Sequence, residues 1–172
     1  MDDTQTTRKW SELRGLAVVG LTEGKKVGTC DDFYFTPTTQ NIHALSIKTG
    51  LLGHKVLLVT NIDAIGQDAI TTAAEEGLQN ESDDERIAAL PLGQNLRSYK
   101  VMSASGTLIG TVGDILIDIS TPRALRISAF ELSGGLRERI SGHYPTFFAA
   151  QVTSWGQDVL VIPDEVAQSL KG

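Results

Sequence analysis

Short runs of apolar and β-branched residues recur along the chain, and each run is bounded by glycine, proline, asparagine or aspartate. Ile115, Ile117 and Ile119 alternate with Leu116, Asp118 and Ser120, which is typical of a strand with one buried face. Runs of this kind predict β-strands at 16–20, 27–35, 42–48, 55–60, 68–72, 98–103, 108–119, 125–132, 146–152 and 158–162. Five short strands in each half favour a small barrel, and a final helix is predicted to begin near Pro163.

The two groups of strands repeat the same pattern of residues. At an offset of 82, Gly24 falls on Gly106, Gly28 on Gly110 and Asp32 on Asp114, and we align Leu45-Ser46 with Ile127-Ser128. At an offset of 90, Gly66-Gln67-Asp68 falls on Gly156-Gln157-Asp158. The alignment predicts that about eight extra residues of the second copy form one surface loop between Phe130 and Phe147.

The charge of the chain is concentrated between the two copies. The 172 residues have a net charge of −6, but residues 73–95 hold six acidic side chains against Arg86 alone. We therefore predict a first barrel at 1–72, an acidic linker with short helical turns at 73–95, and a second barrel with a carboxy-terminal helix at 96–172. A solvated spacer and an acidic docking motif are both open interpretations of the linker.

These repeated residues resemble the PRC-barrel family. The resemblance consists of the G-x-x-x-G steps from Gly24 to Gly28 and from Gly106 to Gly110, the aspartates that follow them, and the closing segments 62–71 and 152–161. It implies an all-β fold of two small PRC-type barrels in tandem. The family includes the cytoplasmic barrel of the photosynthetic reaction-centre H subunit and the carboxy-terminal domain of the ribosome maturation factor RimM. The resemblance implies a protein-interaction module with no shared catalytic residues.

The side chains that could carry chemistry form no recognisable catalytic or metal-binding pattern. His43, His54 and His143 have no partner at metal-ligand spacing, and Cys30 is expected to be a small buried filler. Asp32 and Asp114 are expected to bond to the backbone of turns. The sequence therefore predicts no enzyme, no cofactor and no metal.

Two hairpins are the best candidates for contact with a partner. Leu51 and Leu52 are adjacent in one predicted loop, where a purely solvated loop would seldom place two leucines. The matching loop of the second copy interleaves apolar and cationic side chains, which is the composition of a protein-binding patch. The side chains of this second patch are those of Leu136, Arg137, Arg139, Ile140 and Tyr144. The alternatives are that both loops fold back on their own barrels or pack against each other.

The leading functional hypothesis is a non-enzymatic scaffold that binds a protein through these hairpins. A ribosome-assembly or RNA-processing factor is one alternative, although a sequence pI of about 5.0 disfavours phosphate binding. A peripheral subunit or assembly factor of a photosynthetic membrane complex is another. A single cysteine and the lack of a long apolar run predict a cytoplasmic protein. We expect either a compact monomer with pseudo-dimeric barrels or a homodimer.

Overall fold

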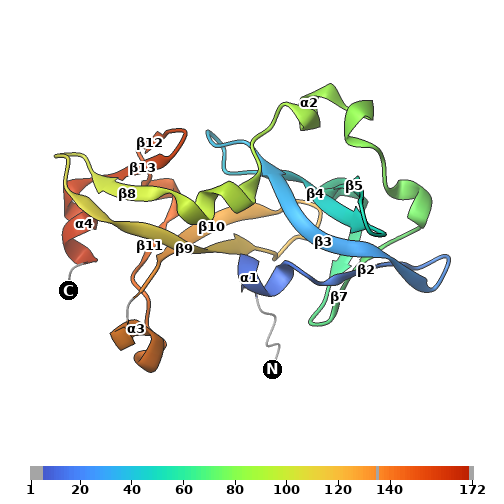
Figure 1. Ribbon diagram of the computed structural model, residues 1–172, viewed down its shortest axis with the longest axis horizontal. Coiled ribbons are helices and arrows are strands. Elements are labelled where there is room, and N and C mark those ends of the chain that lie inside the picture. Colours follow the sequence, from blue (N-terminus) through green and yellow to red (C-terminus); the bar gives the residue numbers. More distant parts are fainter. Residues whose placement is uncertain (1–5, 135, 171–172) are drawn as a thin grey trace.

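Two curled β-sheets with the same strand order make up most of the chain in the computed structural model, which describes residues 6–134 and 136–170 (Figure 1). The first sheet has the order β5-β4-β3-β2-β7-β6, and the second has the order β11-β10-β9-β8-β13-β12. The first sheet contains β2 (Ala17–Gly20), β3 (Lys25–Phe35), β4 (Ile42–Thr49), β5 (Gly53–Leu58), β6 (Ile62–Ile65) and β7 (Ala69–Thr72). The second contains β8 (Lys100–Ser103), β9 (Leu108–Asp118), β10 (Arg126–Leu132), β11 (Thr146–Phe148), β12 (Ser154–Trp155) and β13 (Val159–Ile162). The predicted all-β fold of two tandem barrel-like halves is confirmed.

Short helical segments connect and flank the sheets. Residues 73–95 contain the 3₁₀ turns η2 (Glu75–Gly77) and η3 (Glu81–Asp83), the helix α2 (Glu85–Ala88) and the start of η4 (Gly93–Ser98). The remaining helices are α1 (Trp10–Leu13), α3 (Leu136–Ser141) and α4 (Asp164–Ser169), and two further 3₁₀ turns are η1 (Val59–Asn61) and η5 (Ala149–Gln151). The short helical linker and the final helix after Pro163 are therefore confirmed.

The strand register corrects the sequence alignment of the two repeats. Phe33 pairs with Leu45, and its counterpart Ile115 pairs with Phe130, so Leu45 corresponds to Phe130 and not to Ile127. Ser46 pairs with Val56 and Glu131 with Thr146, so the β10–β11 hairpin is five residues longer than the β4–β5 hairpin. We expected the eight extra residues in one loop, but five lie in this hairpin. The other three lie in the β9–β10 connection, which is longer than the β3–β4 connection by that number.

The repeated glycines shape the first hairpin of each sheet. Gly24 and Gly106 have φ angles of +63° and +94°, which glycine adopts without steric cost. The register shifts beside Gly28 leave Val27 as a bulge, and the shifts beside Gly110 leave Ile109 in the same position. A Cβ atom on Gly28 would lie 2.4 Å from the Ile47 side chain, so this glycine allows β3 to pack closely on β4.

The segment that precedes each sheet crosses over to the other sheet. The strand β1 (Thr7–Lys9) comes before the first sheet but pairs with β9 of the second, where Lys9 lies opposite Leu116. Leu92 comes before the second sheet but pairs with Tyr34 of β3. Figure 1 shows α1 at the centre of the molecule, between the two sheets. The two repeats thus exchange equivalent segments about a pseudo-two-fold axis.

The repeated aspartates hold these exchanged segments in place. Oδ1 of Asp32 accepts the backbone N–H of Gln94 at 2.9 Å, and Oδ1 of Asp114 accepts that of Ser11 at 3.2 Å. The same oxygens also accept the N–H of the next residue in their own strands. These carboxylates bond to the backbone, as expected, but not to turns: one N–H group lies in the aspartate's own strand and the other in a helical segment of the other repeat.

One hydrophobic core extends through both sheets. Buried side chains from Trp10 through Phe33 and Ile115 to Phe147 belong to a single continuous cluster. Trp10 stacks edge-on against Phe33 with ring centroids 4.9 Å apart, and its indole N–H donates to Gln94 at 2.8 Å. Trp155 lies 6.0 Å from Phe35 and 5.5 Å from Phe130, so aromatic contacts also join the repeats at a second place.

Removing one inter-repeat carboxylate should destabilise the whole molecule. Asp114→Ala leaves the N–H groups of Ser11 and Ile115 without their acceptor, so we expect the free energy of unfolding in urea to fall by about 2–3 kcal/mol. Asp118→Ala is the matched control, because among the described residues the Asp118 carboxylate accepts only the N–H of Ser120, within its own turn. Equal losses in the two variants would contradict a special role for the inter-repeat bonds.

The other carboxylate predicts a pH dependence. Burial raises the pKa of Asp32 above its usual value of 3.8, although the N–H groups of Gln94 and Phe33 oppose this shift. Folded protein therefore keeps this proton to a higher pH than unfolded protein, and the stability that Asp32 contributes decreases as pH rises above about 4. We expect the wild type to lose stability relative to Asp32→Asn between pH 4 and pH 7 in urea titrations. If the stability of the wild type relative to Asp32→Asn stays constant or increases from pH 4 to pH 7, the raised pKa of Asp32 is disproved.

Candidate interaction surface

The tip of the β4–β5 hairpin projects two leucines into solvent. Thr49 pairs with Gly53, and Gly50 makes the turn with a φ of +64°. The side chains of Leu51 and Leu52 are 92% and 94% exposed. The alternative that this loop folds back on its own barrel therefore does not describe the structure.

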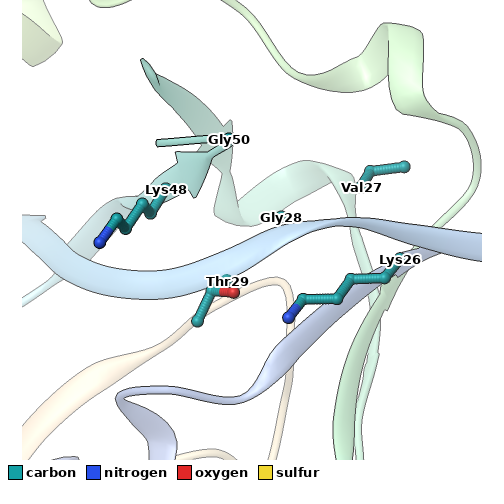
Figure 2. A pocket seen from close by; sticks show the side chains of 6 residues that line it. All are labelled: Lys26, Val27, Gly28, Thr29, Lys48 and Gly50. Atoms are coloured by element: carbon teal, nitrogen blue, oxygen red, sulfur yellow. The ribbon is translucent and has the colours of Figure 1, made fainter. Parts of the chain in front are cut away.

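A shallow hollow of about 510 Å³ lies beside this tip, over the backbone of Gly28 (Figure 2). It is lined by Lys26, Val27, Gly28, Thr29, Lys48 and Gly50. Both lysine side chains are exposed, and Figure 2 shows them on opposite sides of the β3 ribbon. The tip thus combines an apolar end with two cationic side chains at its base.

The longer hairpin of the second repeat carries the other candidates. Arg137 and Arg139 are exposed on α3, and Ile140 is 78% exposed. Tyr144 is half-buried, with the ammonium of Lys9 lying 5.8 Å from its ring centroid. The Leu136 side chain lies outside the described residues. This patch therefore presents an isoleucine between arginines on a helix that the first repeat lacks.

The two hairpins do not form one surface. Figure 1 shows the β4–β5 hairpin in the right half of the molecule and α3 at the lower left. This separation follows from the pseudo-two-fold arrangement, which places equivalent loops at opposite ends. The alternative that the hairpins pack against each other is therefore excluded, and they form two separate patches.

Polar side chains in the described part of the chain make no group that could hold a metal ion. No group of three or more histidine, cysteine or acidic side chains among them could hold a metal ion. Asp31 faces solvent with His54 Nε2 at 3.2 Å and Arg14 at 3.5 Å, whereas Asp32 faces the inter-repeat segment. Glu138 and His143 line an open hollow of about 600 Å³ beside α3, where His143 is exposed.

Arg123 and Arg126 of the second repeat contact the first repeat. Arg123 donates to the carbonyl of Ile62 at 3.2 Å and lies 3.9 Å from Asp63. Arg126 donates to the carbonyl of Thr39 at 3.5 Å. These cations are partly engaged in joining the repeats, which weakens the case for a nucleic-acid surface there.

A second repeated motif was missed by the sequence alignment. Arg14 donates from Nε to the carbonyl of Asp31 at 3.2 Å, and Arg97 donates in the same way to Gly113 at 3.1 Å. Leu13 and Leu96, which precede these arginines, are both buried. The Leu-Arg dipeptide before the first strand of each repeat was the signal that could have found the exchanged segments.

Cys30 is an inert thiol at the inner face of β3. It is 1% exposed, and burial raises its pKa to about 12, with the nearby Asp31 and Asp32 adding to the shift. We expect no reaction of the native protein with Ellman's reagent at pH 8, and one equivalent per chain after unfolding in urea. Rapid reaction of the native protein would instead identify an accessible, activated thiol.

Comparison with known proteins identifies one domain family in the chain. No helix among the described residues has both the length and the apolar character needed to span a membrane. No curated protein matches the chain at a significant level. The family model of the PRC-barrel domain matches residues 5–79, which include the whole first sheet and the crossover strand β1. By this match and by its six-stranded curled sheet, the first repeat of the chain belongs to the PRC-barrel domain family.

Proposed function

We propose that this protein is a non-enzymatic scaffold that binds a partner protein through its hairpins. The observation that carries the proposal is the pair of leucines at the β4–β5 tip, each more than nine-tenths exposed. Exposed apolar groups of this kind, with polar groups around them, are typical of protein-binding sites. Membership of a family of interaction domains without shared catalytic residues supports the same function.

The partner should offer an apolar pocket with carboxylates at its edge. Burial of a leucine side chain contributes about 1.5–3 kcal/mol, so two leucines could supply a large part of the affinity. Lys26 and Lys48 at the base of the tip favour acidic groups on the partner. The α3 patch, with Arg137, Arg139, Ile140 and Tyr144, offers a second contact at the other end of the molecule.

The partner could belong to ribosome assembly or to a photosynthetic membrane complex, the two alternatives that the sequence raised. In either case, the protein would act as an adaptor in the cytoplasm, with two separate patches that could hold two partners at once. Direct RNA binding has no specific support among the described residues.

Charges at the hairpin tip should abolish capture of the partner. We expect Leu51→Asp/Leu52→Asp to lose at least one specific partner in pull-downs from lysate of cells that make the protein naturally, because the carboxylates cannot enter an apolar pocket. Leu21→Asp/Leu108→Asp is the matched control, since it adds the same charge at leucines that are 51% and 56% exposed elsewhere. Identical partner sets for the wild type and the tip variant, with both folded, would remove these leucines from the site.

A further inference from the structure

The outer face of the first sheet is covered by the acidic linker. Tyr34, Ala44 and Val56 on this face are almost completely buried and form a small separate cluster with Ile87 of α2. Leu90 and Leu92 of the linker pack against the same cluster, as does Leu58 of β5. Figure 1 shows the linker and α2 passing over the end of the sheet formed by β3, β4 and β5. The outer face of this sheet is therefore covered by a segment of the chain itself.

Backbone and hydroxyl bonds fix the linker on this face. Gln79 pairs with Val56 on the free edge of β5, through bonds of 2.7 and 2.9 Å in both directions. The hydroxyl of Tyr34 donates to Glu81 at 2.7 Å, and burial together with this carboxylate raises the pKa of Tyr34 to about 12. The linker thus pairs one extended residue with the edge of β5, and the short helical turns that follow bring aliphatic side chains onto the sheet.

The matching face of the second sheet is only partly covered. The register assigns Leu116, Ala129, Thr146 and Phe148 as the counterparts of Tyr34, Ala44, Val56 and Leu58, and we call these four residues the Phe148 face. Phe148 is 61% exposed, although its counterpart Leu58 is packed under the linker. Thr146 is exposed, and no backbone bond among the described residues extends the sheet beyond β11 at this position.

Only one side of the Phe148 face is occupied by the chain itself. Lys9 of β1 lies beside Leu116, forms an ion pair with Glu131 at 3.1 Å and contacts the ring of Tyr144. On the other side, Phe148 borders an unfilled hollow of about 210 Å³ that is also lined by Ser128 and Arg126. The uncovered part thus includes Phe148, whose counterpart Leu58 packs against the cluster that the linker covers in the first repeat.

We propose that the Phe148 face binds a short segment of a partner protein with the chemistry of residues 78–92 of this chain. One extended residue of the segment pairs with the edge of β11 at Thr146, as Gln79 pairs with Val56. The helical turn that follows places aliphatic side chains on Phe148 and Leu116, and acidic groups of the segment face Arg126. This surface is separate from the β4–β5 tip, and it adjoins the α3 patch at Tyr144.

A fluorescent peptide with the sequence of residues 78–92 is the probe, and its anisotropy is measured against the full chain. We expect saturable binding to the wild type, at least tenfold weaker binding to Phe148→Asp, and unchanged binding to Leu108→Asp, whose leucine is 56% exposed elsewhere. Thr146→Pro should also weaken binding at least fivefold, because it removes the backbone N–H that faces outward at the position matching Val56. Leu51→Asp/Leu52→Asp should bind the peptide normally, so the result is separable from the hairpin proposal.

Three results would overturn the proposal. One is the absence of saturable binding to the wild type. Another is equal binding to Phe148→Asp, with circular dichroism confirming its fold, because the peptide would then be displacing the chain's own linker from the first sheet. The third is light scattering near twice 18.5 kDa for the wild type and near 18.5 kDa for Phe148→Asp, because Phe148 would then lie between two copies of this chain.

Discussion

The exchange of segments between the repeats is the constraint on which the rest of the structure depends. Each sheet receives a segment from before the other sheet, and a half-buried or buried aspartate at the same point of each repeat accepts its backbone N–H. A single barrel of about 70 residues is near the lower limit of size at which one core stabilises a fold. The exchange joins two such barrels around one continuous core, so neither repeat has a core of its own.

The pseudo-two-fold arrangement also decides where a partner can bind. It places equivalent loops at opposite ends of the molecule, so the β4–β5 tip and the α3 hairpin are independent patches. The repeats differ in the longer β10–β11 hairpin and in the segment over the outer face of the sheet. The linker covers that face in the first repeat, and the Phe148 face remains largely open in the second. The surfaces proposed for binding are thus mainly those at which the two repeats differ.

Features that depend on residues close together in the sequence were predicted better than features that depend on pairing between distant residues. All ten predicted strands are present, because β-branched runs between turn residues are a local signal. The strands β1, β6 and β12 were missed, since two to four residues are too few to show a period. Ile127-Ser128 resembled Leu45-Ser46 in residue type, but the pairing with β9 assigns Phe130 to Leu45. For the candidate site, the sequence singled out Leu51 and Leu52 but left open whether their loop folds back on the barrel, and the structure shows both side chains exposed.

The sequence by itself determined that the chain is a β-rich tandem repeat, that glycines make its hairpin turns and that its acidity lies between the copies. These features depend on residues close together in the chain. Only the tertiary structure decided that Thr7–Lys9 joins the second sheet, that Leu92 joins the first, and that Asp32 and Asp114 bond the exchanged segments. Such bonds connect residues far apart in sequence, and they form only when both sheets are folded and share the core that makes their burial favourable.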